Sequence, residues 1–420
     1  MCSPGMHAFF IERNLGIMMQ ANKAASLWTA CKTHIRSFSL PPEEKHIDVL
    51  DGFRALFVLL IARYHIWQLG WLWTDVWLFG EKVQLDYLLQ TGYIWVDGLM
   101  LLSGFLLFLP YTGKSKPVPI LTFYKRRLIR ILPSYLLCII PLFILALIEH
   151  KYASTGDAVK DLAAHLTFTH TLFPFSYQQT PLNGALWTLA VEMQFYLIFP
   201  LLGWCFKKKP GITWLFMTSI AFLWRWHISA LPDNSLYINQ LPAFLDVYAN
   251  GFAAASIFAT LRNKMDKNGG DTRLKVFFTV IFFLCICLIV PLLQGQAQRQ
   301  GYENIRLGQL ENRFGFSVLL ACAMISAAFS LPFLRFLLGN KLMAFLSAIS
   351  LQLYIWHQWL SARIRDWDFI PHNAPAQPWA SAADQLWRQK YTIVCFAAAI
   401  IVAGLITYLY EKPIARKLRK

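Results

Sequence analysis

Long runs of apolar residues, separated by short polar and charged segments, dominate the sequence from residue 49 to residue 410. Each run is about 18 to 22 residues long, which is enough to cross a bilayer core of roughly 30 Å as a helix. The pattern predicts an all-α, polytopic membrane protein with about ten transmembrane helices, at 49–70, 92–110, 131–149, 185–206, 212–231, 241–261, 275–294, 314–332, 343–361 and 391–410.

The segments on either side of this region divide the chain into three parts. Residues 1–45 mix charged and apolar positions without the charged start, compact apolar core and small-residue cleavage site of a signal peptide. We expect them to form a cytosolic or membrane-surface lead-in. Residues 46–415 form the ten-helix membrane domain, because no other stretch is long enough to bury a core of its own. Residues 416–420 form a basic cytosolic tail.

The distribution of Lys and Arg predicts the orientation of these helices. If the N-terminus is cytosolic, 26 of the 39 Lys and Arg residues fall in inner segments and 10 in outer segments. Inner segments of membrane proteins are enriched in these cations, so we expect both termini in the cytosol. The net charge of +16 does not indicate a nucleic-acid partner, since neither a soluble basic face nor a binding motif accompanies it.

Composition is typical of a membrane protein, and the cysteines do not indicate a metal site. The chain is 56% hydrophobic and only 15% charged, which is outside the usual range of soluble globular proteins. Six of the eight cysteines lie inside apolar runs, and none has a CxxC partner. We therefore predict neither a disulfide framework nor a metal site.

Two ionisable residues of the first predicted helix are eleven positions apart. Eleven steps of 100° bring Arg54 and His65 to within about 20° of the same helix face, roughly 16 Å apart along the axis. One face would thus join an inner cation to an outer imidazole. Coenzyme A has a matching shape, with phosphates that bind arginine and a thioester at the end of a long arm. Alternatively, Arg54 anchors to lipid phosphate and His65 is a hydrogen-bonded core histidine.

Two acids lie at a depth similar to that of His65. Asp97 lies about five residues, and Glu192 about seven residues, below the outer end of its predicted helix. A histidine base needs a partner that fixes its tautomer and stabilises the imidazolium, and a carboxylate serves both purposes. Either acid could orient His65, but a histidine–carboxylate pair could equally relay protons in a transporter.

A cluster of cations precedes the third predicted helix. It contains Arg126, Arg127 and Arg130 within a segment that also carries apolar residues. Such clusters are typical of lipid-headgroup contacts and of inner segments in general. Arg127 and Arg130 are also three residues apart on one helix face, so that they could clamp a diphosphate.

Six segments together resemble the acyltransferase-3 family, the bacterial-type membrane O-acyltransferases that modify cell-surface carbohydrates. The resemblance extends over nearly all of 46–415 in the expected order. Its segments are Leu50–Ala55 with His65, Val96–Asp97 with Ser103–Phe105, Arg126–Pro133, Leu186–Tyr196, Leu353–His357 and Tyr410–Pro413.

This resemblance implies a ten-helix core, an acetyl or other short acyl group drawn from coenzyme A, and transfer to an extracytoplasmic sugar hydroxyl. The family's essential arginine and histidine would be Arg54 and His65, and its paired arginines Arg127 and Arg130. Its acid in the fourth helix would be Glu192, although Met193 replaces the second acid that family members often have. The implied location is the cytoplasmic (inner) membrane of a bacterium, with membrane lipids around the protein.

We therefore predict a membrane-bound O-acyltransferase that moves an acyl group, most simply acetyl, from cytosolic acyl-CoA to a carbohydrate or lipid-linked glycan. His65 would act as general base, or would itself carry the acyl group, oriented by Glu192 or Asp97. Arg54, Arg126, Arg127 and Arg130 would bind the donor phosphates. The alternatives are a transporter or flippase for a glycan or other polar substrate, and a structural or sensory membrane protein. The sequence indicates no particular oligomeric state.

Overall fold

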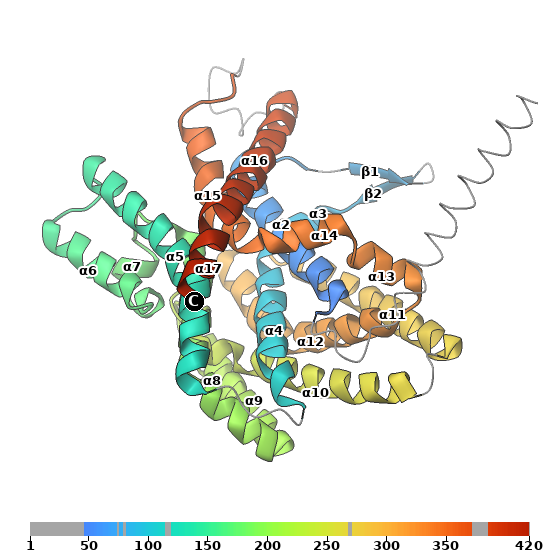
Figure 1. Ribbon diagram of the computed structural model, residues 1–420. Helices are drawn as coiled ribbons and strands as arrows, with labels where there is room; N and C mark the ends of the chain where they lie inside the picture. The colour runs from blue at the N-terminus through green and yellow to red at the C-terminus, as the bar shows by residue number, and fades with distance from the viewer. Residues whose placement is uncertain are drawn as a thin grey trace, which may run out of the picture.

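Helices make up nearly all of the computed structural model, which describes residues 46–73, 75–78, 81–113, 119–267, 271–371 and 385–419 (Figure 1). The predicted lead-in, residues 1–45, lies outside the described residues. The long helices are α2 (Asp48–Gly70), α4 (Trp95–Phe108), α5 (Ile120–Ile148), α8 (Trp187–Lys208), α9 (Pro210–Ser229), α10 (Leu245–Lys267), α11 (Thr272–Ala297), α12 (Tyr302–Phe329), α15 (Ser350–Asp366) and α16 (Gln385–Ile406). The shorter helices are α3 (Asp86–Gln90), α6 (Thr155–Leu166), α7 (Pro174–Tyr177), α13 (Pro332–Leu338), α14 (Lys341–Ala348) and α17 (Lys412–Arg419).

The predicted helical fold is confirmed, with one exception outside the apolar runs. Strands β1 (Asp75–Leu78) and β2 (Glu81–Gln84) form an antiparallel hairpin between α2 and α3. Its register pairs Val76 with Val83. The prediction treated this segment only as an outer connection, because it is too short to cross a membrane.

Seven helical segments among the described residues are long and apolar enough to span a membrane, or eight if one bent pair is counted as a single span. By sequence range, α2 and α9 are not among them, although a helix is present at both predicted positions. α2 carries Asp48, Asp51, Arg54 and Arg63, which lower its apolar content. The chain is thus a multi-pass membrane protein, whereas ten spans and cytosolic termini stay predictions.

The bent pair corresponds to the single helix that was predicted at 343–361. The helical segments Pro332–Ala348 and Ser350–Asp366 meet at an angle of 58°. Ser347 and Ser350 flank the break, and the Ser347 hydroxyl donates to the Asp51 carboxylate of α2 (2.7 Å) instead of to its own helix. Both halves of the pair, α14 and α15, pack against α2.

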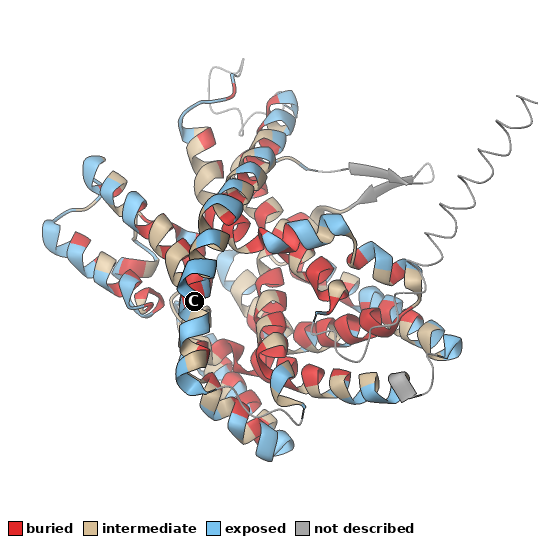
Figure 2. Cartoon of the chain, in the orientation of Figure 1, coloured by how far each residue is buried: buried red, intermediate tan, exposed pale blue. Residues whose placement is uncertain are grey.

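Burial separates central helices from peripheral ones (Figure 2). The segment Gly92–Tyr111, which contains α4, is 72% buried, whereas Thr272–Ala297, which is α11, is only 28% buried. The exposed side chains of α11 are largely apolar and include Phe277, Phe283 and Leu288. Apolar side chains on the outside are expected where lipid replaces water.

The central helix α4 lies very close to α10 because glycines form their contact. A Cβ atom on Gly251 would lie 2.5 Å from the backbone oxygen of Leu101, and one on Gly104 would lie 2.9 Å from that of Tyr248. No other residue type fits there without moving a backbone. Small residues allow this close approach, which compensates for the weak hydrophobic driving force between helices in lipid.

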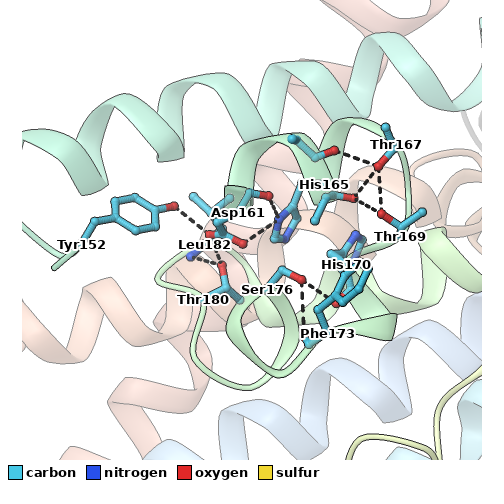
Figure 3. A network of polar contacts seen from close by, with 12 residues as sticks. Tyr152, Asp161, His165, Thr167, Thr169, His170, Phe173, Ser176, Thr180 and Leu182 are labelled. Atoms are coloured by element: carbon cyan, nitrogen blue, oxygen red, sulfur yellow. Dashed lines mark hydrogen bonds and ion pairs between the residues drawn. The ribbon is translucent and has the colours of Figure 1, made fainter. Parts of the chain in front are cut away.

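A polar network holds together the segment that contains α6 and α7 (Figure 3). Asp161 accepts hydrogen bonds from Tyr152 and Thr180 (both 2.8 Å) and contacts the His165 Nδ1 atom (3.1 Å). The ring of His165 stacks on that of His170, with 4.2 Å between centroids. On α8, Gln194 donates to the backbone oxygen of Phe168 (2.9 Å), next to this network. The segment with α6 and α7 thereby contacts the helix that carries Glu192.

Acid is expected to weaken this segment through His170, which lies outside the candidate membrane spans. Burial, and secondarily the neighbouring His165, lowers the pKa of His170 to about 3. In the unfolded chain a histidine binds a proton below about pH 6.5, whereas folded His170 does so only near pH 3. Its contribution to stability is therefore present above about pH 6.5 and falls as the pH drops toward 3.

The measurement is the melting temperature of the detergent-purified protein between pH 7 and pH 4. The His170→Gln variant should lose less stability on acidification than the wild type, by up to about 1.4 kcal/mol per pH unit. His150→Gln, which changes an exposed histidine of the same outer segment, serves as the control. Equal acid sensitivity of His170→Gln and the wild type would contradict the prediction.

Candidate active site

Arg54 and His65 share one face of α2, as their spacing predicts. The Arg54 Nη1 atom donates to the Ser347 hydroxyl of α14 (3.4 Å). The His65 ring lies next to His357 of α15, with 5.3 Å between the ring centroids. Both side chains thus face the bent pair α14–α15. The Arg54 guanidinium and the His65 imidazole therefore lie on the same side of α2, one against α14 and the other against α15.

A cavity next to Arg54 contains most of the predicted donor-binding cations. Its empty volume is about 730 Å³, including space that is open to solvent. Arg54, Arg127, Arg130 and Glu192 line it, together with apolar residues that include Val58, Leu99, Met100, Leu102, Leu106, Leu107, Leu189 and Leu351. Cations combined with an apolar wall suit a molecule that has both phosphates and an extended, weakly polar arm.

The three arginines of the basic segment differ in their surroundings. Arg127 is half-buried, with its guanidinium 5.5 Å from the ring centroids of both Phe123 and Tyr196. Arg130 lines the cavity from the next turn of α5. Arg126 is exposed and is not among the cavity's described lining residues. The predicted pair of Arg127 and Arg130 is brought together, and Arg126 lies apart from it.

Glu192 joins two segments that are far apart in the sequence. Its Oε1 atom accepts a hydrogen bond from the Ser103 hydroxyl of α4 (2.9 Å) and another from the Tyr196 hydroxyl of its own helix. Its negative charge also acts on Arg54, since the two groups interact across the cavity. These contacts place Glu192 with the cations and hydroxyls of the cavity.

Gln68 is the hydrogen-bonding partner of His65 among the described residues. The Gln68 amide nitrogen donates to the Tyr64 hydroxyl (2.8 Å), so its amide oxygen faces the His65 Nδ1 atom (3.0 Å). This arrangement assigns the proton of the neutral imidazole to Nδ1, because an amide oxygen only accepts. The Nε2 atom is left with a free lone pair, which is the form a general base requires.

His357 is a second imidazole at this position, and no role was predicted for it. Its Nδ1 atom donates to the backbone oxygen of Tyr354 (2.7 Å), which leaves Nε2 as an acceptor. That Nε2 atom is buried and has no hydrogen-bonding partner within the described parts of the chain. The signal in the sequence was a histidine within an apolar run, but nothing there indicated its neighbour. A buried acceptor without a donor is a site for an incoming hydroxyl or a proton.

Asp97 makes its contacts elsewhere. The Arg313 Nε atom lies 3.2 Å from its carboxylate, and both side chains are fully buried. The Arg313 guanidinium also lies 4.0 Å from the centroid of the Phe244 ring and donates to the backbone oxygen of Ala243 (3.3 Å). A second buried pair, in which Arg225 binds Asp246, shares that oxygen.

The ion pair between Asp97 and Arg313 was not predicted because the start of α12 was misplaced. The sequence placed Arg313 at the end of an outer segment, directly before a helix at 314–332. Instead α12 begins at Tyr302, after Gly301 with its φ of 82°. Arg313 therefore lies within the helix and reaches Asp97. Asp97, one of the two carboxylates that could have oriented His65, is thus bound to a cation on another helix.

Comparisons with known proteins identify the family of the chain. A family model described as an acyltransferase domain matches residues 47–408. The Bacillus subtilis (strain 168) protein YrhL, provisionally named a peptidoglycan O-acetyltransferase, is 25% identical over 88% of this chain and 55% of its own length. The O-acetyltransferase OatA of Staphylococcus aureus (strain NCTC 8325 / PS 47) is 29% identical over 43% of this chain and 29% of its own length.

The peptidoglycan O-acetyltransferase OatA of Listeria monocytogenes (serovar 1/2a) is 28% identical over 37% of this chain and 24% of its own length. The chain thus spans about half the length, or less, of these curated relatives. No solved structure matches it significantly. Because the family model covers most of the chain, and does so in the region that holds the cavity and the histidine pair, the chain belongs to the acyltransferase-3 family.

Proposed function

We propose that the chain transfers an acetyl group from acetyl-CoA, or another short acyl group from its acyl-CoA, to a hydroxyl of a cell-surface carbohydrate or lipid-linked glycan. The observation that carries the proposal is the cavity lined by Arg54, Arg127 and Arg130, with His65 farther along the same face of α2. The names of the relatives support acetyl as the group and a carbohydrate as the acceptor. The proposed location is a bacterial cytoplasmic membrane, with the donor on the cytosolic side.

The residues of the cavity fit a coenzyme A donor, which supplies an activated thioester. Arg127 and Arg130 bind the diphosphate, and Arg54 holds the part nearest to the membrane interior. Guanidinium groups form strong, directional hydrogen bonds to phosphates, and stacking on Phe123 and Tyr196 restricts Arg127 before the donor binds. Glu192 opposes the cations and keeps them in position.

His65 performs the proton transfer in this proposal. Its Nε2 atom accepts the proton of the acceptor hydroxyl while the hydroxyl oxygen bonds to the acyl carbon and the carbon–sulfur bond breaks. The same proton then passes to the departing thiolate, which leaves as a thiol. Gln68 holds the imidazole in the tautomer that makes this possible. In a variant of the scheme, His65 Nε2 carries the acyl group between donor and acceptor.

A transporter or flippase remains the second candidate, because one observation favours it. Broken helices are common at the substrate sites of transporters, and the α14–α15 pair is bent by 58° where it faces α2. Comparing ester formation with glycan transport in a His65→Ala variant separates the two candidates. Loss of the ester with transport intact supports the enzyme, and loss of transport with the ester intact supports the transporter.

The donor site can be tested by comparing two neighbouring arginines of α5. Arg130→Ala is expected to raise the KM for acetyl-CoA about 10- to 100-fold, because a charge-assisted contact to phosphate is lost. Arg126→Ala changes an exposed arginine outside the cavity and should leave the KM within about twofold. The readout is transfer of radiolabelled acetyl from acetyl-CoA to extracted cell-surface glycans, followed by mass spectrometry of the ester. The same response to both substitutions would contradict the assignment.

A further inference from the structure

A second cavity adjoins the first at the C-terminal end of the chain. Its empty volume is about 910 Å³, and it shares Arg54, Arg130, Ser350 and Leu351 with the first cavity. The remaining lining residues are Ser347, Ala348, Glu411, Lys412, Ala415 and Arg416. Because the two cavities share four lining residues, they lie side by side between α2, α5, the bent pair and α17, and we refer to them together as the recess.

The position of α17 depends on an unusual turn of the preceding helix. Residues Thr407–Glu411 form a π-helix, a rare element that is frequently found at functional sites. The Glu411 carboxylate accepts a hydrogen bond from Gln352 of α15 (2.7 Å). The same amide of Gln352 also contacts Ser134 of α5. The segment Tyr410–Pro413, which the sequence singled out without a role, thus attaches α17 to the wall of the recess.

The charges in this second cavity are mainly positive. Lys412 and Arg416 are four residues apart on one face of α17, and Arg54 and Arg130 come from the shared wall. Glu411 is the acid among its lining residues, and Gln352 holds its carboxylate. Lys412 and Arg416 thus add two cations next to the proposed diphosphate site, and they suit a further phosphate of the same ligand.

We infer that Lys412 and Arg416 bind the 3′-phosphate of the coenzyme A donor. The inference rests on the proposed function and adds two residues to the proposed donor-binding arginines Arg54, Arg127 and Arg130. The diphosphate lies between Arg127 and Arg130, the acyl arm points toward His65, and the nucleotide end occupies the second cavity. A lipid headgroup has the same phosphate chemistry, but the second cavity shares Arg54 and Arg130 with the proposed donor cavity, which favours the nucleotide.

The test compares coenzyme A with dephospho-coenzyme A, which lacks only the 3′-phosphate. Binding of each to the purified full-length protein in nanodiscs of phosphatidylcholine is measured by calorimetry. The wild type is expected to bind coenzyme A about 10- to 100-fold more tightly than dephospho-coenzyme A. The double variant Lys412→Ala/Arg416→Ala should lose this preference and bind dephospho-coenzyme A as the wild type does. Lys417→Ala changes an exposed lysine of the same helix that is not among the lining residues, and should keep the preference.

Each contrary result has its own meaning. If the wild type binds both nucleotides equally, the 3′-phosphate site is wrong while the proposed donor stands. If the double variant loses both nucleotides together, α17 acts through folding and the inference fails. If the double variant loses co-purified anionic lipid and keeps its nucleotide preference, the cations bind lipid headgroups instead. If neither nucleotide binds the wild type, the proposed donor fails as well.

Discussion

The His65→Ala variant is expected to lose acetyl transfer by about a hundredfold to ten-thousandfold, which is the usual contribution of a general base. The physical reason is the free Nε2 lone pair, which accepts the proton of the attacking hydroxyl while Gln68 holds Nδ1. Without the imidazole, no described side chain in contact with this position offers an equivalent base except His357. The measurement is the single-turnover rate of acetyl transfer from acetyl-CoA to the acceptor.

Donor binding provides the internal control for this variant. Arg54 and His65 are roughly 16 Å apart along α2, so His65→Ala should bind coenzyme A as the wild type does. His227→Ala, which changes an exposed histidine of α9, should retain full activity. A His65→Ala protein that binds the donor and transfers acetyl at the normal rate would refute the role of His65. A labelled acyl-protein that forms in the wild type and is absent in this variant would favour the covalent scheme.

The Asp97→Ala variant is expected to be destabilised by about 3–5 kcal/mol, because Arg313 would remain fully buried without its carboxylate. The melting temperature in detergent should fall steeply, and the yield of folded protein should fall with it. The loss would be structural in origin, since Asp97 contacts Arg313 of α12 and lies on α4 in the buried centre of the protein.

A double variant separates this structural role from a catalytic one. Replacing both partners, as Asp97→Leu/Arg313→Leu, removes the buried charges together and should recover much of the lost stability. If Asp97 acts only through the ion pair, acetyl transfer should recover along with folding. A double variant that is folded, binds coenzyme A and remains inactive would instead place Asp97 in the chemistry. Arg306→Ala, at a partly exposed ion pair with Asp233, should change stability by less than about 1 kcal/mol.

The sequence predicted those features that depend on local spacing. Helix positions followed from apolar length, and the common face of Arg54 and His65 followed from a separation of eleven residues. The pairing of Arg127 and Arg130 followed in the same way from their spacing of three. In each case one helix fixes the geometry, so that no knowledge of other helices is needed.

Features that depend on contacts between helices were not predicted. Depth along the membrane placed Asp97 at the level of His65. Residues at one depth can still lie far apart, so depth alone does not determine which side chains are in contact. The pairing with Arg313 depended on where α12 begins, and apolar content alone put that boundary twelve residues too late. The approach of His357 to His65 depended on how α15 continues after the bend at Ile349. Apolar length also does not decide the number of spans, because α2 carries four charged residues that lower its apolar content.

The bend between α14 and α15 gives the two ends of the reaction path separate supports. Arg54 donates a hydrogen bond to Ser347, which precedes the bend. His65 lies against His357, which follows the bend. A rotation of α14 about Ile349 would therefore move the Ser347 contact of Arg54 and leave the imidazole pair in place. In such a motion a spent donor leaves toward one side of the membrane while the barrier around the histidines stays closed. In the proposed scheme, the break in the helix would thus allow donor exchange on one side while the histidine pair keeps the other side closed.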